Sequence, residues 1–296
     1  MMDLKASPST KSYAANKGVN LEALARSTGR TTLGREDVDA HLSGTVPVAT
    51  APDQTRYWDV DHSAHGPVTE EPLSRMARVA AANLSAAGAL IPQVTHHDRA
   101  DISAVDALRK SWRDEAQARG LKLTALSFHV MALSRCLREF PRFNASLTPN
   151  GETLVLKDYV HIGIAVDTPN GLLVPVIRNA DKKGLWQLSS EIADLAARAQ
   201  ARKIGPEEMG GASMSISNLG GIGGIGFTPI VNPPELAILG ITRTETVTIW
   251  TGSTPHAVPM VPLDLSYDHR VINGADAARF VTRYAQLIAC PQMMIL

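Results

Sequence analysis

Residues 160–199 read VHIGIAVDTPNGLLVPVIRNADKKGLWQLSSEIADLAARA and combine two kinds of apolar periodicity. Over 160–166 and again over 171–177, apolar residues alternate with a period of two, as they do in strands. After these segments, apolar residues recur at steps of three and four, which is typical of an amphipathic helix. The helix positions are Leu185, Leu188, Ile192, Leu195 and Ala199. This stretch therefore predicts strands and helices packed in one domain.

The sequence on both sides continues to mix the two patterns. Further helices are predicted near 73–87, 103–119, 125–139 and 275–289. Further strands are predicted near 94–102, 154–156, 212–217, 236–241 and 258–266. Because both kinds of element occur throughout residues 67–296, the sequence predicts a mixed α/β domain there.

The composition excludes several classes of protein. The 296-residue chain is 44% hydrophobic and 20% charged, a balance that allows a sizeable core. Lys plus Arg and Asp plus Glu each number 29, so nonspecific nucleic-acid binding is not expected. Cys136 and Cys290 are too few for a disulfide framework or a cysteine-rich zinc site, and both are predicted to be buried. No apolar run approaches the roughly 18 residues of a membrane span, and residues 1–5 show no signal peptide, so a cytoplasmic protein is expected.

Residues 1–45 are expected to form a small all-helical unit, which a linker at 46–66 joins to the larger domain. The predicted elements are a helix from Ser7 to Lys17 that ends at Gly18, a single turn at 20–24 and a second helix at 35–42. Residues 1–35 contain six basic and two acidic side chains. This local excess of positive charge fits either a solvated helical surface or a surface for an acidic partner.

The densest candidate for a functional site is Leu265–Gly274, LSYDHRVING, at the end of a predicted strand. His269 follows this strand, and strand ends are where α/β sheets place their sites. A histidine there can take and return a proton near neutral pH. Asn273 is suited to capping the helix that follows. The alternative interpretation is a buried structural histidine at a turn.

A second candidate is Ala212–Gly226, ASMSISNLGGIGGIG. Alternation places Ser213, Ser215 and Ser217 on one face of a strand, and Ser217 ends that strand. Its hydroxyl can donate a hydrogen bond to a developing oxyanion. The glycines that follow can admit a ligand close to the backbone, or can form an ordinary loop. They match neither a phosphate-binding loop nor a dinucleotide fingerprint.

No metal site is predicted. His96 and His97 are adjacent in an extended segment, so their side chains point to opposite faces. No cysteine or carboxylate lies at a spacing that would let it bind the same metal ion. His129 lies in an apolar helix and is expected in the core.

Several segments, in the same order along the chain, resemble the catalytic domain of the dihydrolipoamide acyltransferases. These proteins are the core components of 2-oxoacid dehydrogenase complexes. The resemblance covers residues 67–296 and is carried by Leu73–Met76, Ile91–Thr95, Phe143–Ser146, Val160–Ile177, Phe227–Glu235 and Asp268–Ala275. It implies a chloramphenicol-acetyltransferase-like fold with a mixed sheet, and subunits that form homotrimers. Most members have aspartate where this chain has Asn273. The asparagine form resembles the subgroup that serves bacterial pyruvate dehydrogenase, which implies acetyl transfer.

The resemblance also implies how the reaction proceeds, as acyl transfer between coenzyme A (CoA) and dihydrolipoamide. His269 would take the thiol proton, and the Ser217 hydroxyl would hold the oxyanion. Asn273 would hold the turn, with a polar contact to Arg109. Ser217 and His269 would come from neighbouring subunits. The apolar tail Met293–Leu296 would either pack within its own subunit or plug a neighbouring trimer in a hollow cubic core.

Residues 1–45 resemble, less closely, the peripheral-subunit-binding domain of the same proteins. The similarity is carried by Ser7-Pro8, Gly18–Leu21, Thr28–Arg30 and Glu36–Val38. It implies binding of dihydrolipoamide dehydrogenase or of the pyruvate dehydrogenase component. The chain starts too late for a lipoyl domain. Either that part has been removed, or the lipoyl group is supplied in trans by a separate carrier.

Three other functions stay open. A serine hydrolase would use Ser217 as nucleophile and His269 as base, although the usual Gly-x-Ser-x-Gly elbow is missing. A non-catalytic scaffold of the complex core would retain the fold and only organise partners. A free-standing CoA-dependent acetyltransferase would act on a small hydroxylated molecule.

Overall fold

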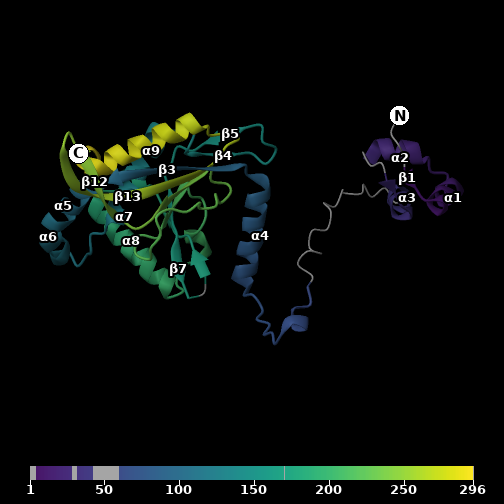
Figure 1. The fold of residues 1–296 in the computed structure, drawn as a ribbon, viewed down its shortest axis with the longest axis horizontal. Coiled ribbons are helices and arrows are strands. Elements are labelled where there is room, and N and C mark those ends of the chain that lie inside the picture. Colours follow the sequence, from purple (N-terminus) through teal and green to yellow (C-terminus); the bar gives the residue numbers. More distant parts are fainter. Residues whose placement is uncertain (1–4, 29–31, 43–59, 170, 296) are drawn as a thin grey trace. The chain divides into compact units, whose positions relative to one another are not determined.

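The computed structural model describes residues 5–28, 32–42, 60–169 and 171–295 (Figure 1). The chain divides into two compact units, 1–71 and 72–296. The predicted linker falls largely on residues 43–59, which lie outside the described residues, so its boundaries stay a prediction. Gly29, Arg30 and Leu296, on which other predictions depended, also lie outside them.

The described part of the N-terminal unit contains three short α-helices, a 3₁₀ turn at His62–His65 and one pair of parallel strands. The elements are β1 (Lys5–Ala6), α1 (Pro8–Asn16), α2 (Leu21–Thr28), β2 (Thr32–Leu33) and α3 (Arg35–Leu42). The predicted start of α1 is confirmed, since the Ser7 hydroxyl accepts a hydrogen bond from the Thr10 amide. The single turn predicted after Gly18 is a full helix, because the Asn20 side chain accepts from two amides and caps it. The strand pair means that this unit is not all-helical.

The larger unit contains a seven-stranded mixed sheet, which confirms the predicted mixed α/β class. Its strand order is β12-β13-β11-β10-β6-β9, and β3 pairs with β13. The strands are β3 (Gln93–Asp101), β6 (Ile162–Ile164), β9 (Val176–Ile177), β10 (Met214–Asn218), β11 (Ala237–Ile241), β12 (Glu245–Thr251) and β13 (Thr254–Asp268). The strands β6, β10 and β11 run parallel, whereas the other pairs are antiparallel.

The two strands expected at 160–166 and 171–177 are each divided. The end of the first segment forms β7 (Val166–Thr168) and the start of the second forms β8 (Gly171–Leu173). These two strands pair with each other in a separate hairpin. A further small sheet pairs β4 (Ala145–Leu147) with β5 (Leu154–Leu156). Alternation alone predicts an extended backbone but does not tell which neighbour each half pairs with.

Apart from the short C-terminal helix α10, which the sequence did not predict, the helices of this unit lie close to their predicted positions. They are α4 (Arg75–Leu90), α5 (Ser103–Ser111), α6 (Arg113–Ala118), α7 (Ala125–Glu139), α8 (Leu185–Gln200), α9 (Gly274–Ala289) and α10 (Gln292–Ile295). Short 3₁₀ turns cover Ala180–Lys182 and Pro206–Glu208. The single helix predicted at 103–119 is broken at Trp112 into α5 and α6.

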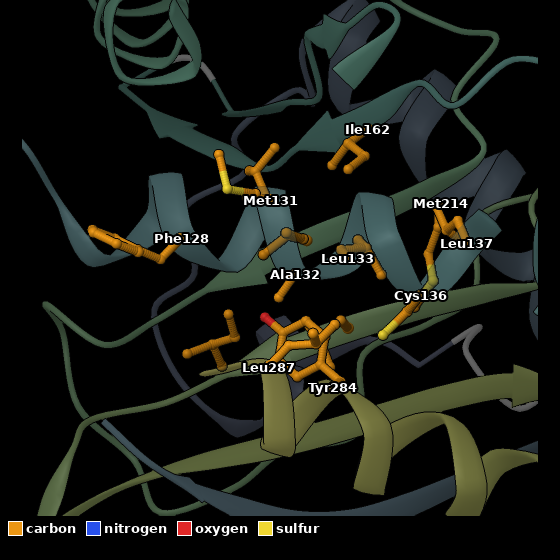
Figure 2. Packing of buried hydrophobic residues seen from close by; sticks show 14 of the residues in the cluster. Phe128, Met131, Ala132, Leu133, Cys136, Leu137, Ile162, Met214, Tyr284 and Leu287 are labelled. Atoms are coloured by element: carbon orange, nitrogen blue, oxygen red, sulfur yellow. The ribbon is translucent and has the colours of Figure 1, made fainter. Parts of the chain in front are cut away.

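The main hydrophobic core lies between the helices and one face of the sheet. Figure 2 shows α7 between Ile162 and Met214 of the sheet and Tyr284 of α9. His129 is buried in this core, as predicted, and its Nδ1 lies 2.6 Å from the Tyr284 hydroxyl. Burial lowers the pKa of His129 to about 4, because the charged imidazole would be desolvated there.

The two cysteines differ in their surroundings. Cys136 is buried in α7, as predicted, and burial raises its pKa well above the usual range of a thiol. The prediction for Cys290 is wrong, because this residue is exposed where it ends α9. Its apolar neighbours in the sequence belong to the helix, but the helix end itself faces solvent.

Apolar residues lie along one face of α4, the helix predicted near 73–87, but most of them are not buried within the chain. Val79 is 54% exposed and Leu84 is 44% exposed, and Ala87 is the buried residue of this helix. A cavity of about 660 Å³ lies between α4 and β8. A single copy of the chain therefore leaves an apolar helix face in contact with solvent.

Candidate active site

His269 is located immediately after the last residue of β13. Its backbone amide donates a hydrogen bond to the Pro92 carbonyl at 3.1 Å, and its ring lies 5.8 Å from that of Tyr267. The residue is exposed. Among the residues that the structure describes, no side chain forms a hydrogen bond with its imidazole. Both ring nitrogens are therefore accessible for proton transfer.

The turn that presents His269 is held by Asp268, which the sequence analysis did not single out. The Asp268 carboxylate is buried and accepts hydrogen bonds from the Arg270 amide at 3.0 Å and from Arg270 Nη2 at 2.6 Å. Its carbonyl accepts from the amides of Val271 and Ile272. An acidic residue directly before His269 and a basic residue directly after it form a pattern from which the sequence could have identified this pair.

Asn273 caps the helix that follows the turn. Its side-chain oxygen accepts a hydrogen bond from the Asp276 amide at 2.9 Å at the start of α9, which confirms the predicted cap. The predicted contact with Arg109 is not made within the chain. Arg109 instead donates to Asp106 at 2.7 Å and to the Leu123 carbonyl at 3.2 Å, because an acid lies one helical turn away on α5.

Ser217 is located near the end of β10, at the start of the glycine-rich loop. The side chain is partly buried and lies opposite Gly240 of β11. Within the described parts of the chain, its hydroxyl has no hydrogen-bond partner. It is therefore available to donate to a ligand.

The strand register separates Ser217 from His269. Ser217 lies opposite Gly240, and Gly240 lies opposite Asp264 on β13, two strands away. His269 lies five residues after Asp264, just past the end of β13. With about 3.3 Å per residue and about 4.8 Å per strand, the two residues are roughly 20 Å apart. The structure therefore does not bring the two predicted catalytic groups together within one copy of the chain.

A second polar cluster includes Ser215, two residues before Ser217 on β10. Glu235 is buried, and its Oε1 accepts a hydrogen bond from Ser215 Oγ at 2.9 Å. Its Oε2 has no partner among the described residues. Burial raises the pKa of Glu235 to about 7. Lys157, which donates to the Ala212 carbonyl at 3.0 Å, has a pKa lowered by burial.

Glu235 predicts a dependence of stability on pH. Its pKa is about 7 in the folded protein, compared with 4.5 for an exposed glutamate. The contribution of Glu235 to the free energy of unfolding is therefore complete below pH 4.5. As the pH rises from 4.5 to about 7, at most about 3 kcal/mol of this free energy is lost. In Glu235→Gln this loss should be absent. Urea unfolding between pH 4.5 and 8, at one protein concentration, measures it.

The matched control for this prediction is Glu152→Gln, which replaces an exposed glutamate on a turn. It should retain the pH dependence of the parent protein. Equal pH dependence in the parent and in Glu235→Gln would show that Glu235 does not titrate as proposed.

His97, the second of the two adjacent histidines on β3, pairs with an aspartate on the neighbouring strand β13. His97 Nδ1 lies 2.6 Å from Oδ1 of Asp264, a partner that the sequence did not predict.

The described residues contain no group of three or more His, Cys, Asp or Glu side chains that could hold a metal ion. In the same residues, no helix has the length and apolar character needed to cross a membrane.

A family model matches most of the chain. The model describes the 2-oxoacid dehydrogenases acyltransferase (catalytic domain) and matches residues 65–296. A curated relative from Azotobacter vinelandii, the dihydrolipoyllysine-residue acetyltransferase component of the pyruvate dehydrogenase complex, is 43% identical over 96% of this chain and 46% of its own length. The corresponding protein of Pseudomonas aeruginosa is 42% identical over 98% of this chain and 55% of its own length. The chain thus spans about half the length of these curated relatives.

Solved structures agree with the family match. The dihydrolipoamide acetyltransferase of A. vinelandii is 47% identical and superposes with a TM-score of 0.79, over 80% of this chain and 98% of its own. A structure described as the cubic core of the pyruvate dehydrogenase multienzyme complex has the same identity, TM-score and coverage.

Proposed function

The chain belongs to the 2-oxoacid dehydrogenase acyltransferase family, and on this premise we propose that it transfers an acetyl group between CoA and dihydrolipoamide. The acetyl group is favoured because the curated relatives are acetyltransferase components of pyruvate dehydrogenase complexes. The lipoyl group of a lipoyl domain is then the second substrate. The cytoplasmic location expected from the sequence stays a prediction.

The assignment of the site depends on the spacing along the chain between Ser217, His269 and Asn273. The description of the A. vinelandii structure names a serine, a histidine 52 positions later and an asparagine four positions after that, in its catalytic mechanism. Ser217, His269 and Asn273 have the same spacing in this chain. Their surroundings support these roles, because the first two side chains are free for a ligand and the third caps the adjoining helix.

The proposed reaction is a thiol-to-thiol transfer. His269 takes the proton of the attacking thiol, since a free thiol with a pKa near 8.5 is mostly protonated at neutral pH. The thiolate forms a bond to the thioester carbonyl carbon, and the resulting oxyanion accepts a hydrogen bond from Ser217. The carbon–sulfur bond to the leaving thiolate then breaks, and His269 returns the proton to that sulfur. No acyl-enzyme is formed.

We place this site between two subunits. The register separates Ser217 from His269 by roughly 20 Å in one chain, which is too far for both to contact the same carbonyl. The exposed apolar residues of α4 support contact with a second copy. A homotrimer is the assembly expected for the family, and the related cubic core supports assembly into a larger particle. Of the tail, Met294 is buried in its own subunit, whereas Met293 and Ile295 are partly exposed.

The N-terminal unit would bind a peripheral enzyme, dihydrolipoamide dehydrogenase or the pyruvate dehydrogenase component. Its exposed Lys17 and Arg35 lie over the Tyr13 ring, with centroid distances of 6.0 Å and 5.3 Å. The Tyr13 hydroxyl donates to Asp39 at 2.7 Å, which anchors the ring. These basic groups support an electrostatic contact with an acidic face of the partner.

Acetyl transfer from acetyl-CoA to free dihydrolipoamide tests the proposal directly. The same protein is assayed with propionyl-, succinyl- and isobutyryl-CoA, and the highest kcat/KM is expected for acetyl-CoA. Absence of transfer with all four donors would favour the scaffold function. Rapid transfer to a small alcohol but not to dihydrolipoamide would favour a free-standing acetyltransferase.

Replacing Ser217 with alanine should lower kcat by about 10²-fold or more, while the KM for both substrates changes little. The reason is that the lost hydrogen bond forms to the oxyanion, which exists in the transition state and not in the bound substrate. Steady-state kinetics with acetyl-CoA measures the effect. An unchanged kcat would remove Ser217 from the mechanism, and a burst with a trapped acyl-serine in the parent would favour a serine hydrolase.

A further inference from the structure

A histidine and a buried aspartate form a pair on the sheet, outside the proposed catalytic groups. His97 of β3 lies opposite Asp264 of β13, with 2.6 Å between Nδ1 and Oδ1. The Asp264 side chain is 3% exposed, whereas that of His97 is 57% exposed. Because a carboxylate only accepts hydrogen bonds, Nδ1 of His97 must carry the proton in this contact.

The second oxygen of Asp264 holds the end of the glycine-rich loop. The Phe227 amide donates to Oδ2 at 3.1 Å. A Cβ atom at Gly226 would lie 3.4 Å from Oδ1, so this glycine lets the loop approach the carboxylate. One carboxylate thus joins β3, β13 and the loop that begins just after Ser217.

The Phe227 ring extends this contact towards Ser217. A Cβ atom at Gly240 would lie 2.7 Å and 2.9 Å from two ring carbons of Phe227, so the ring occupies the space above that glycine. Gly240 is the residue opposite Ser217 on the neighbouring strand. Residues directly opposite each other point to the same face of a sheet, so the ring lies between Ser217 and Asp264 on one face.

We infer that the His97–Asp264 pair is a positioning pair for the Ser217 half of the active site. It holds the loop 219–227 and the Phe227 ring against the sheet, and the ring forms one wall beside the Ser217 hydroxyl. Without His97, the buried carboxylate loses one of its two partners, and the loop anchored to it loosens. The kinetic part of this inference rests on the proposed acetyl transfer, whereas the structural part does not.

Hydrogen–deuterium exchange of the assembled protein tests the structural part. His97→Ala should increase the exchange rate of amides in 219–228 by about 10-fold, because the anchored segment opens more often. His97→Asn should restore the parent rate to within about 2-fold, since its amide can donate from the Nδ1 position. The matched control is His96→Ala, the adjacent histidine on the opposite face of β3, which should leave this segment unchanged.

Kinetics tests whether the pair acts through Ser217. His97→Ala should lower kcat by about 10-fold with little change in KM, because a small displacement of the site lowers the rate. In a Ser217→Ala background, the same substitution should lower kcat by less than about 2-fold, since the hydroxyl that it positions is already absent.

Two results would overturn the inference. One is unchanged exchange of 219–228 in His97→Ala, and the other is an equal loss of kcat with and without Ser217. If the parent protein transfers no acetyl group, the proposed function fails, whereas the exchange measurement still decides whether the pair holds the loop.

Discussion

Replacing His269 with alanine is expected to lower kcat for acetyl transfer by about 10³-fold, within the range typical of a lost general base. The physical reason is that the attacking thiol is then deprotonated only by solvent, and the leaving thiolate receives no proton from the protein. The fold should be retained, because the turn is held by Asp268 with Arg270 and by the Asn273 cap, none of which uses the imidazole.

The comparison is made by steady-state kinetics on assembled protein of parent-like size. His256→Ala is the matched control, because His256 is also an exposed histidine of the same sheet, in the part of β13 that pairs with β12. It should retain kcat within about 2-fold of the parent. Transfer by His269→Ala at a rate near that of the control would refute the role of His269 as base.

Mixed assemblies of two inactive variants are expected to recover activity. If each site takes Ser217 from one subunit and His269 from its neighbour, some sites between a His269→Ala subunit and a Ser217→Ala subunit contain both intact residues. In a 1:1 mixture that is dissociated and reassembled at random, about one quarter of the sites are intact, so about one quarter of the parent kcat should return.

The control for this experiment is the same mixture combined after assembly, without subunit exchange, which should show no recovery. Reassembled mixtures that stay as inactive as the separate variants would show that both residues act within one chain. The strand register argues against that outcome, because it places the two residues roughly 20 Å apart.

Local patterns in the sequence predicted much of the fold because the interactions behind them are also local. Helix α7 has the predicted bounds, since apolar residues at steps of three and four indicate a buried helix face without knowledge of its neighbours. The caps at Ser7 and Asn273 are confirmed for the same reason, as each side chain bonds an amide three residues away. The α-helical region at 103–119 was less well predicted, because its break at Trp112 has no proline or glycine signal.

The sequence by itself thus determined the fold class, most helices and the candidate catalytic residues. The tertiary structure was needed for every relation between distant segments, since strand order and register depend on how the whole core packs. It separated Ser217 from His269, gave Arg109 a local partner in place of Asn273, and paired His97 with Asp264 across 167 positions. A side chain that can form a hydrogen bond carries no mark of its partner until packing brings the two together.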